Sequence, residues 1–379
     1  MDIGLAMTAR VLPGDERPLP DVYRQVIDEA VLGEELGFSS WLIAEHHFAE
    51  DRHNPSQFPL LAAAAARTHK IRLGTYVLLL ALHNPIRVAE DAATVDILSN
   101  GRLILAIGAG PMENECAVFG IAPKERFGRT YEALEVLDKC FSGEQFSHEG
   151  RYYTFRDTQM TTTPVQPGGP PIYMAAMGPQ SLAKAGERGY NLASVLHTPL
   201  VHVYADAQAE AGRTRDDYRL MSGPVTVHIA PTRDQAWDEA ERALHWWVTF
   251  YRNRGFDMPL PPVNEMRSTP GVGIFGQPFA VGTPDDVLAV LQTHKDADLD
   301  EMVIQFNHPG MGADAVARSM RMFADELMPE VKRWGRAGAG TAGTAGTAGT
   351  AGTAGTAGTA GTAGTAGTAG TAETKAAVS

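Results

Sequence analysis

The chain lacks the features that define several large classes of protein. Its 379 residues include only two cysteines, Cys116 and Cys140, and these form neither a Cys-x-x-Cys pair nor another metal-ligand spacing. A disulfide-stabilised fold is therefore excluded, and we expect a reducing, cytoplasmic compartment. No basic cluster stands out, and 45 acidic against 32 basic residues give a net charge of −13. This balance argues against a nucleic-acid partner.

Long hydrophobic runs are missing too. The longest apolar segments, such as Val77 to Leu82, are far shorter than the roughly 20 residues that span a bilayer. The N-terminus reaches Arg10 and Asp15 without the long apolar core of a signal peptide. We therefore expect no membrane partner.

What the sequence does contain is a regular alternation of strand and helix patterns. Apolar runs predict strands at Ile3–Met7, Trp41–Ala44, Ile71–Leu80, Leu103–Ile107 and Ile172–Ala175, with further units beginning near Asn191, Pro224 and Met302. Amphipathic patterns predict helices at about Asp21–Leu36, Gln57–Arg67, Arg87–Leu98, Phe127–Phe141 and Gln180–Arg188. Near-continuous apolar strands are typical of parallel sheets covered on both faces. About eight such units predict a (β/α)8 barrel; a doubly wound sheet is the alternative, but it usually has fewer strands.

Two stretches interrupt the alternation and are predicted to be insertions in the barrel. The first covers residues 142–171, and the second covers residues 255–282 and carries Phe256, Phe275 and Phe279. Long insertions in compact domains are often functional. The second insertion either covers a pocket as a lid or packs on its own aromatic side chains at the surface.

The C-terminal part of the chain has a different composition. From Gly340 to Ala372 the sequence repeats Gly-Thr-Ala without a break. Alanine and threonine bury too little surface to offset the entropy of ordering a glycine-rich chain. We therefore divide the chain into a folded domain of residues 1–334 and a disordered low-complexity tail of residues 335–379.

Glu45-His46-His47 directly follows the second predicted strand. In a barrel of this kind, the carboxyl ends of the strands carry the catalytic groups. An imidazole at such a position can bind a metal, carry a proton or donate a hydrogen bond near neutral pH. The alternative is a histidine pair whose hydrogen bonds are satisfied by neighbouring polar groups. No metal ligand is assigned.

Two glycine-containing turns follow other strands. After the fifth strand, the segment from Ala176 to Ser181 leads into a helix, and unpaired backbone N–H groups at a helix N-terminus favour a phosphate. An ordinary turn with Pro179 as a helix starter is the alternative. After the fourth strand, Gly108-Ala109-Gly110 lacks the third glycine of a dinucleotide motif. These glycines indicate either that the backbone passes close to another group at the mouth of the barrel or that the chain makes a tight turn.

Four blocks of sequence together resemble one known family. The blocks are WLIAEHHF at 41–48, LGT at 73–75, HNPIRVAED at 83–91 and DILSNGR at 96–102. In order and spacing they resemble the bacterial luciferase-like monooxygenases, which are flavin-dependent oxidoreductases of the alkanal monooxygenase type. The resemblance covers roughly residues 1–334 and does not specify a substrate.

The resemblance implies a (β/α)8 barrel that binds reduced FMN at the C-terminal ends of its strands. His46 matches the family's catalytic histidine, which lies beside the flavin. Tyr76 and Val77 match a non-prolyl cis peptide that packs against the isoalloxazine ring. Ala176, Met177, Gly178 and Ser181 match the turn that binds the FMN phosphate.

Two positions depart from luciferase itself. Gly108 stands where luciferase has a reactive cysteine, which is expected to leave room above the flavin ring and argues against light emission. Ala109 stands where luciferase has a phosphate-binding arginine, so the affinity for oxidised flavin is expected to be modest. A weakly held flavin suits a two-component system, in which a separate flavin reductase supplies the reduced form.

The sequence thus predicts a monooxygenase that uses reduced FMN and O2 to insert one oxygen atom into a small organic aldehyde, ketone or hydrocarbon. His46 would handle a proton, while Met7 and the second insertion would form the apolar wall for the substrate. Two alternatives stay open: hydride transfer with the deazaflavin F420, and a flavin-binding protein without turnover. The sequence also leaves open whether the chain forms a homodimer.

Overall fold

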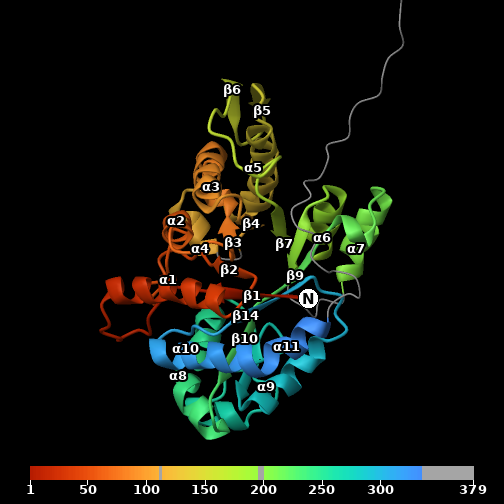
Figure 1. Cartoon of the computed structure of the whole chain (residues 1–379). Coiled ribbons are helices and arrows are strands. Elements are labelled where there is room, and N and C mark those ends of the chain that lie inside the picture. Colours follow the sequence, from red (N-terminus) through yellow and green to blue (C-terminus); the bar gives the residue numbers. More distant parts are fainter. Residues whose placement is uncertain (111–112, 195–199, 335–379) are drawn as a thin grey trace, which may run out of the picture. The chain divides into compact units, whose positions relative to one another are not determined.

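A computed structural model describes residues 1–110, 113–194 and 200–334 of the chain (Figure 1). The tail predicted at residues 335–379 lies outside the described residues. Within them, no helix combines the length and the apolar composition needed to cross a membrane.

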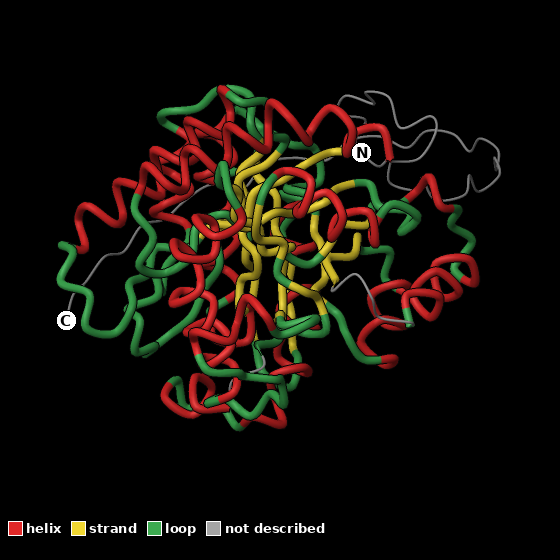
Figure 2. The backbone as a smooth tube through the Cα atoms, turned by 90° about the horizontal axis from the view of Figure 1, so that it is seen from below, coloured by secondary structure: helices red, strands yellow, loops and turns green. Residues whose placement is uncertain are grey.

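Eight parallel strands form a closed ring. Around the ring they are β1 (Asp2–Met7), β2 (Ser40–Ile43), β3 (Arg72–Leu79), β4 (Leu103–Gly108), β7 (Ile172–Ala175), β8 (Asn191–Ser194), β9 (Leu220–Ser222) and β14 (Glu301–Gln305). The ring closes where β14 pairs with β1, with Leu5 opposite Ile304. In Figure 2 the strands lie at the centre and the helices surround them. The predicted (β/α)8 barrel is therefore confirmed.

The seventh unit is interrupted. It was predicted near Pro224, but its first strand, β9, begins at Leu220. After Gly223 and Pro224 the chain continues as β10 (Val225–Ile229), which pairs with β14 and with the short strand β13 (Ala280–Gly282). Because proline has no backbone N–H to donate, it interrupts the strand at this point.

Helices cover the outside of the ring. They are α1 (Leu19–Glu35), α2 (Phe58–Ala65), α3 (Pro85–Ser99), α4 (Glu113–Val118), α5 (Arg126–Phe141), α6 (Pro179–Glu187), α7 (Val201–Glu210), α8 (Arg233–Arg252), α9 (Pro284–Leu291), α10 (Ala313–Met322) and α11 (Met328–Val331). Short 3₁₀ helices lie at Leu80–Leu82, Pro123–Glu125, Arg215–Asp217, Val263–Ser268, Gln292–His294 and Lys332–Trp334, and a π-helical turn lies at Phe323–Leu327. α3 shows how the sequence sets a boundary: the Asn84 side chain accepts hydrogen bonds from the N–H groups of Ile86 and Arg87.

The strands bury both of their faces. One set of side chains fills the barrel interior, including Leu42, Ile104, Tyr173 and Val303. Alternate residues pack outward against the helices, as Leu5 and Leu105 do in the main core cluster. This two-sided burial explains why the strands read as near-continuous apolar runs.

Both predicted insertions carry small antiparallel pairs of strands. In the first, β5 (Phe146–Glu149) pairs with β6 (Thr154–Thr158), and Glu132 of α5 accepts hydrogen bonds from the N–H groups of Tyr152 and Tyr153. In the second, β11 (Gly273–Ile274) pairs with β12 (Gln277–Pro278). The second insertion packs against α8 in a separate apolar cluster. It is therefore anchored to the barrel domain and does not pack on its own aromatic side chains alone.

Candidate active site

One cavity of about 400 Å³ lies at the C-terminal ends of the barrel strands. Its lining includes Met7 at the end of β1, Leu79 at the end of β3 and Ala175 at the end of β7. The structure brings all of the predicted site residues to this one cavity: His46, Tyr76, Val77, Gly108, Ala176, Met177, Gly178 and Ser181. Its volume falls in the usual range for sites that bind small molecules.

His46 lies at the cavity wall and is held by a carboxylate. Its Nδ1 lies 3.1 Å from Oε1 of Glu115, and the same oxygen accepts the His47 N–H at 2.8 Å. Because a carboxylate only accepts hydrogen bonds, Nδ1 of His46 carries a proton. In a neutral ring this leaves Nε2 as the nitrogen that can accept a proton. Glu115 belongs to α4, which follows β4, and the sequence analysis did not identify it.

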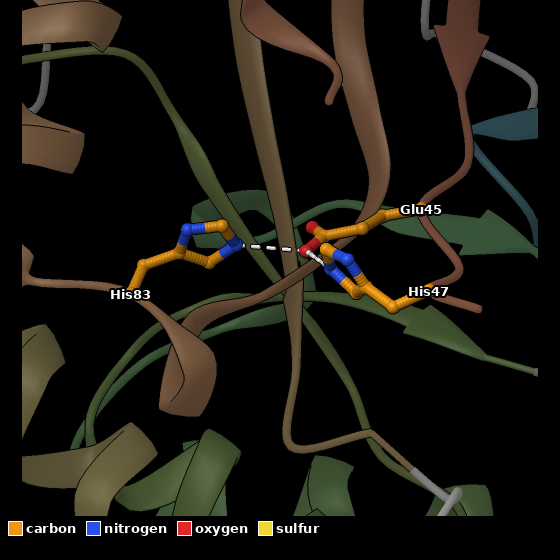
Figure 3. Close-up of side chains that lie close together, drawn as sticks. All are labelled: Glu45, His47 and His83. Atoms are coloured by element: carbon orange, nitrogen blue, oxygen red, sulfur yellow. Dashed lines mark hydrogen bonds and ion pairs between the residues drawn. The ribbon is translucent and has the colours of Figure 1, made fainter. Parts of the chain in front are cut away.

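The ring of His47 belongs to a second hydrogen-bond network, formed with Glu45 and His83 and drawn in Figure 3. Oε1 of Glu45 accepts hydrogen bonds from Nε2 of both His47 and His83, each at 2.7 Å. The N–H of Leu79 donates to the other oxygen at 3.0 Å. Burial alone would raise the pKa of Glu45, but these hydrogen bonds outweigh it and hold the pKa at about 2. Unlike its neighbour, His47 does not belong to the described lining of the cavity.

The ligand atoms of Glu45, His47 and His83 lie within 4.8 Å of one another, which is close enough to surround a metal ion. The same two nitrogen atoms already donate to the carboxylate. A metal would have to replace both hydrogen bonds. The arrangement is thus complete as a hydrogen-bonded triad that supports the loop after β2.

Tyr76 and Val77 lie in β3 and line the cavity beside Gly108 of β4. The peptide bond between Tyr76 and Val77 is cis, in agreement with the resemblance. The Tyr76 hydroxyl donates to the carbonyl oxygen of Ser222.

One expectation for Gly108 is wrong. A Cβ atom at Gly108 would lie 2.7 Å from Cγ2 of Val77, so the space that a cysteine side chain would occupy is filled by Val77. The glycine does not leave room above a flavin ring. Instead it allows β4 to lie close to the Val77 side chain.

The opposite end of the cavity contains the turn before α6. Gly178 is the N-cap of this helix, and no side chain among the described residues caps it. Gly178 has φ −95°, and the nearest atom to a Cβ there would be Oγ of Ser181 at 3.9 Å. The fold itself thus does not require glycine, and the missing side chain leaves an open cradle at the start of α6, where the first N–H groups of a helix have no intrahelical partner. Ser181 Oγ donates to the Gly178 carbonyl at 2.9 Å.

Arg126, at the start of α5, supplies a cation that the sequence analysis missed. It lines the same cavity as Gly178 and Ser181. Its Nη1 donates to the carbonyl of Pro123 at 2.8 Å, while its buried Nε has no hydrogen-bond partner among the described residues. Arg126 on α5 therefore offers the positive charge that is missing at Ala109.

The remaining wall comes from α8 and the second insertion. Trp247 and Tyr251 of α8 line the cavity together with Phe256 and Phe275 of the insertion. Phe279, the third phenylalanine of the insertion, packs instead in the apolar cluster behind this wall. His53 also lines the cavity, with its ring centroid 4.8 Å from that of His46.

A closed parallel barrel with a histidine and an open helix N-terminus at the C-terminal ends of its strands is an architecture typical of barrel enzymes. The chain belongs to the luciferase-like monooxygenase family, whose sequence model matches residues 1–300. The family comprises flavin- or F420-dependent oxidoreductases.

Three relatives illustrate the range of the family. The chain is 29% identical to an F420-dependent glucose-6-phosphate dehydrogenase of Microbacterium testaceum, over 82% of this chain and 94% of the relative. It is 26% identical to the crystal structure of the monooxygenase RslO1 of Streptomyces bottropensis, with a TM-score of 0.76 over 87% of this chain and 99% of that one. The oxygenating constituent of 3,6-diketocamphane monooxygenase from Pseudomonas putida, in complex with FMN, is 22% identical, with a TM-score of 0.71 over 87% and 98%. The last likeness shows the fold alone.

Proposed function

We propose that this chain is a flavin-dependent monooxygenase that uses reduced FMN and O2 to insert one oxygen atom into a small organic aldehyde, ketone or hydrocarbon. A separate flavin reductase would supply the reduced FMN, in the cytoplasm. The observation that carries the proposal is the single cavity in which the carboxylate-held His46 and the open cradle at Gly178 face the same space.

The residues present fit FMN. The N-terminal end of α6, the space beside Gly178 and the guanidinium of Arg126 together would hold a phosphate. The apolar surface of Val77, beside Gly108, would support the flavin ring. When bound, reduced flavin supplies the reaction with oxygen.

His46 would provide the proton handling at the other end of the cavity. The hydrogen bond to Glu115 fixes the ring so that Nε2 can accept or return a proton. Trp247, Tyr251 and Phe275 would exclude water from the reacting groups. Glu115 is thus a positioning residue, and His46 is the candidate catalytic residue.

Hydride transfer with F420 is the second candidate, favoured by the likeness to the F420-dependent dehydrogenase. F420 carries a longer acidic tail than FMN. Among the described residues that line the cavity, Arg126 is the single arginine and no lysine is present, and the chain has a net charge of −13. One cation at the cradle suits a single phosphate better than a row of carboxylates.

Anaerobic titration with reduced FMN, followed by admission of oxygen, and a parallel titration with oxidised F420 test the proposal. We expect reduced FMN to bind, and an aldehyde or ketone from a panel to be oxygenated as oxygen is consumed. Binding of F420 and its reduction by an alcohol or sugar phosphate would establish the second candidate instead. Binding of reduced FMN without any oxygenated product would leave a flavin-binding protein without turnover.

A further inference from the structure

The cavity has a lobe whose wall is largely aromatic. Tyr251 lies at its centre: its ring centroid is 4.9 Å from that of Phe275, 5.6 Å from that of Phe256 and 6.4 Å from that of His46. The wall built by α8 and the second insertion therefore adjoins the candidate catalytic histidine. Aromatic faces of this kind pack well against a ring-shaped ligand.

Three polar side chains of the cavity lining lack partners in the part of the chain that the structure describes. Gln277 of β12 is 7% exposed, and neither its Oε1 nor its Nε2 has a hydrogen-bond partner among the described residues. The same holds for both ring nitrogens of His53, which is 5% exposed, and for Oγ1 of Thr8. All three residues line the cavity. Buried polar groups are rarely left unpaired in native proteins, so a ligand or an ordered water must complete them.

Several other polar side chains of the cavity lining are bonded within the protein. The His46 ring is bonded to Glu115, the Ser181 hydroxyl to Gly178 and the Tyr76 hydroxyl to Ser222. Elsewhere in the lining, Nε of Arg126 is also unpaired among the described residues, so Gln277, His53 and Thr8 are distinguished as the unpaired groups that carry no charge. Their position marks where hydrogen-bonding atoms of a ligand would lie.

Gln277, His53 and Thr8 are uncharged. Burial, followed by the nearby His46 and Arg10, holds the pKa of His53 well below its usual range, so its ring offers one donor and one acceptor near neutral pH. The amide of Gln277 offers the same combination. A matching ligand is neutral and presents both acceptor and donor oxygen atoms, as a ketone with a hydroxyl group does.

We propose that this lobe binds a neutral, ring-containing hydroxyketone, whose oxygen atoms are recognised by Gln277 and His53 beside His46. The inference rests on the proposed monooxygenase function, and it narrows the substrate class of that function. Straight-chain aldehydes offer one acceptor oxygen but no donor and no ring, so they would leave some of the polar groups unpaired. They would therefore bind more weakly.

Equilibrium binding of a matched pair of probes tests the proposal without requiring turnover. The probes are 5-hydroxy-1-tetralone and 1-tetralone, which differ by one hydroxyl group, with decanal as a chain-shaped comparison. Titrations use the whole chain with bound FMN. We expect the hydroxyketone to bind about tenfold more tightly than the ketone, and decanal to bind more weakly than both.

Gln277→Leu should reduce the tenfold preference to about twofold or less, while FMN affinity stays unchanged and reports an intact fold. Gln277→Met provides a second apolar variant of similar size, and Gln159→Leu, on the exposed part of the first insertion, is the matched control. Equal binding of the two tetralones by the unaltered protein, or a preference that survives in both Gln277 variants, would overturn the proposal and leave ordered water as the partner of these groups. Selective binding without oxygenated product would count against the monooxygenase function alone.

Discussion

The two walls of the cavity differ in how their polar side chains are hydrogen-bonded. On the barrel wall, His46 is bonded to Glu115, Ser181 to Gly178 and Tyr76 to Ser222, although Oγ1 of Thr8 is unpaired among the described residues. On the wall next to α8 and the second insertion, Gln277 and His53 have no partner among the described residues. Groups paired within the protein keep their geometry whether or not a ligand is bound, which suits chemistry common to many substrates. Unpaired groups gain hydrogen bonds only from a matching ligand, which suits discrimination between substrates.

The largest effect is expected on the barrel wall. His46→Ala should fold and bind FMN, because the ring lies in the loop after β2, lines the cavity and does not belong to the apolar core clusters. Product formation should fall by about 10²–10⁴-fold, the range for a lost acid–base group. Since reduced flavin still reacts with oxygen, hydrogen peroxide should rise as product falls, and both are measured in one assay.

His47→Ala is the control for that variant. Its ring bonds to Glu45 and does not belong to the described lining of the cavity, so His47→Ala should lower stability without changing the ratio of product to hydrogen peroxide. The assignment fails if His47→Ala is the uncoupled variant and His46→Ala keeps normal coupling.

Glu115→Gln tests how much the hydrogen bond between Glu115 and His46 contributes to product formation. The amide keeps the shape but loses the charge that fixes Nδ1–H of His46 and receives the His47 N–H. A buried hydrogen bond to a charged group is worth about 1.5–3 kcal/mol, so product formation should drop by roughly tenfold to a hundredfold. FMN affinity should not change. Glu132→Gln, whose carboxylate bonds only in the first insertion, is the control, and an equal loss there would remove the special role of Glu115.

A smaller effect is expected at the phosphate end. Arg126→Leu should weaken FMN binding by about tenfold or more, because it removes a charge-assisted bond. Ser181→Ala should have the lesser effect, since its hydroxyl already donates to Gly178. Fluorescence titration of FMN measures both affinities. Unchanged affinity in Arg126→Leu would show that helix N–H groups alone hold the phosphate.

The sequence predicted the barrel wall better than the opposite wall. Apolar periodicity located the strands, and short motifs at their ends identified His46 and Gly178. Sequence analysis did not identify Glu115 and Arg126, because each lies on a helix whose position relative to the strand ends is set only when the ring of strands closes. Gly108 was misread because its neighbour, Val77, lies on the adjacent strand and only the fold brings the two together. Gln277 belongs to a two-residue strand that has no periodicity to detect.

The triad of Glu45, His47 and His83 should make stability depend on pH. The hydrogen bonds that lower the pKa of Glu45 to about 2 stabilise the fold above the usual value of 4.5, and this contribution is lost as pH falls toward 2. Burial lowers the pKa of His83, but the bond to Glu45 raises it on balance above 6.5. The contribution of His83 is therefore full below 6.5 and lost as pH rises through the raised value.

Urea unfolding across this pH range checks the triad. The difference in stability between the unaltered chain and His83→Gln should be greatest between about pH 4.5 and 6.5 and should shrink at alkaline pH. A difference that does not vary with pH would show that His83 acts through packing.

The smallest effect is expected from removing residues 338–379. Because the Gly-Thr-Ala repeat offers almost no surface to bury, we propose that the folded domain ends near Trp334. Truncation should leave the melting temperature and the FMN affinity unchanged. A clear loss of either would assign the repeat a part in folding or assembly.

A crystal structure of the chain with FMN tests the division between the two walls most directly. The account predicts the phosphate at Gly178, Ser181 and Arg126, the flavin ring against Tyr76 and Val77, and the lobe at Gln277 and His53 still open to a second ligand. A phosphate bound elsewhere, or a flavin ring that fills the lobe and bonds to Gln277, would contradict it.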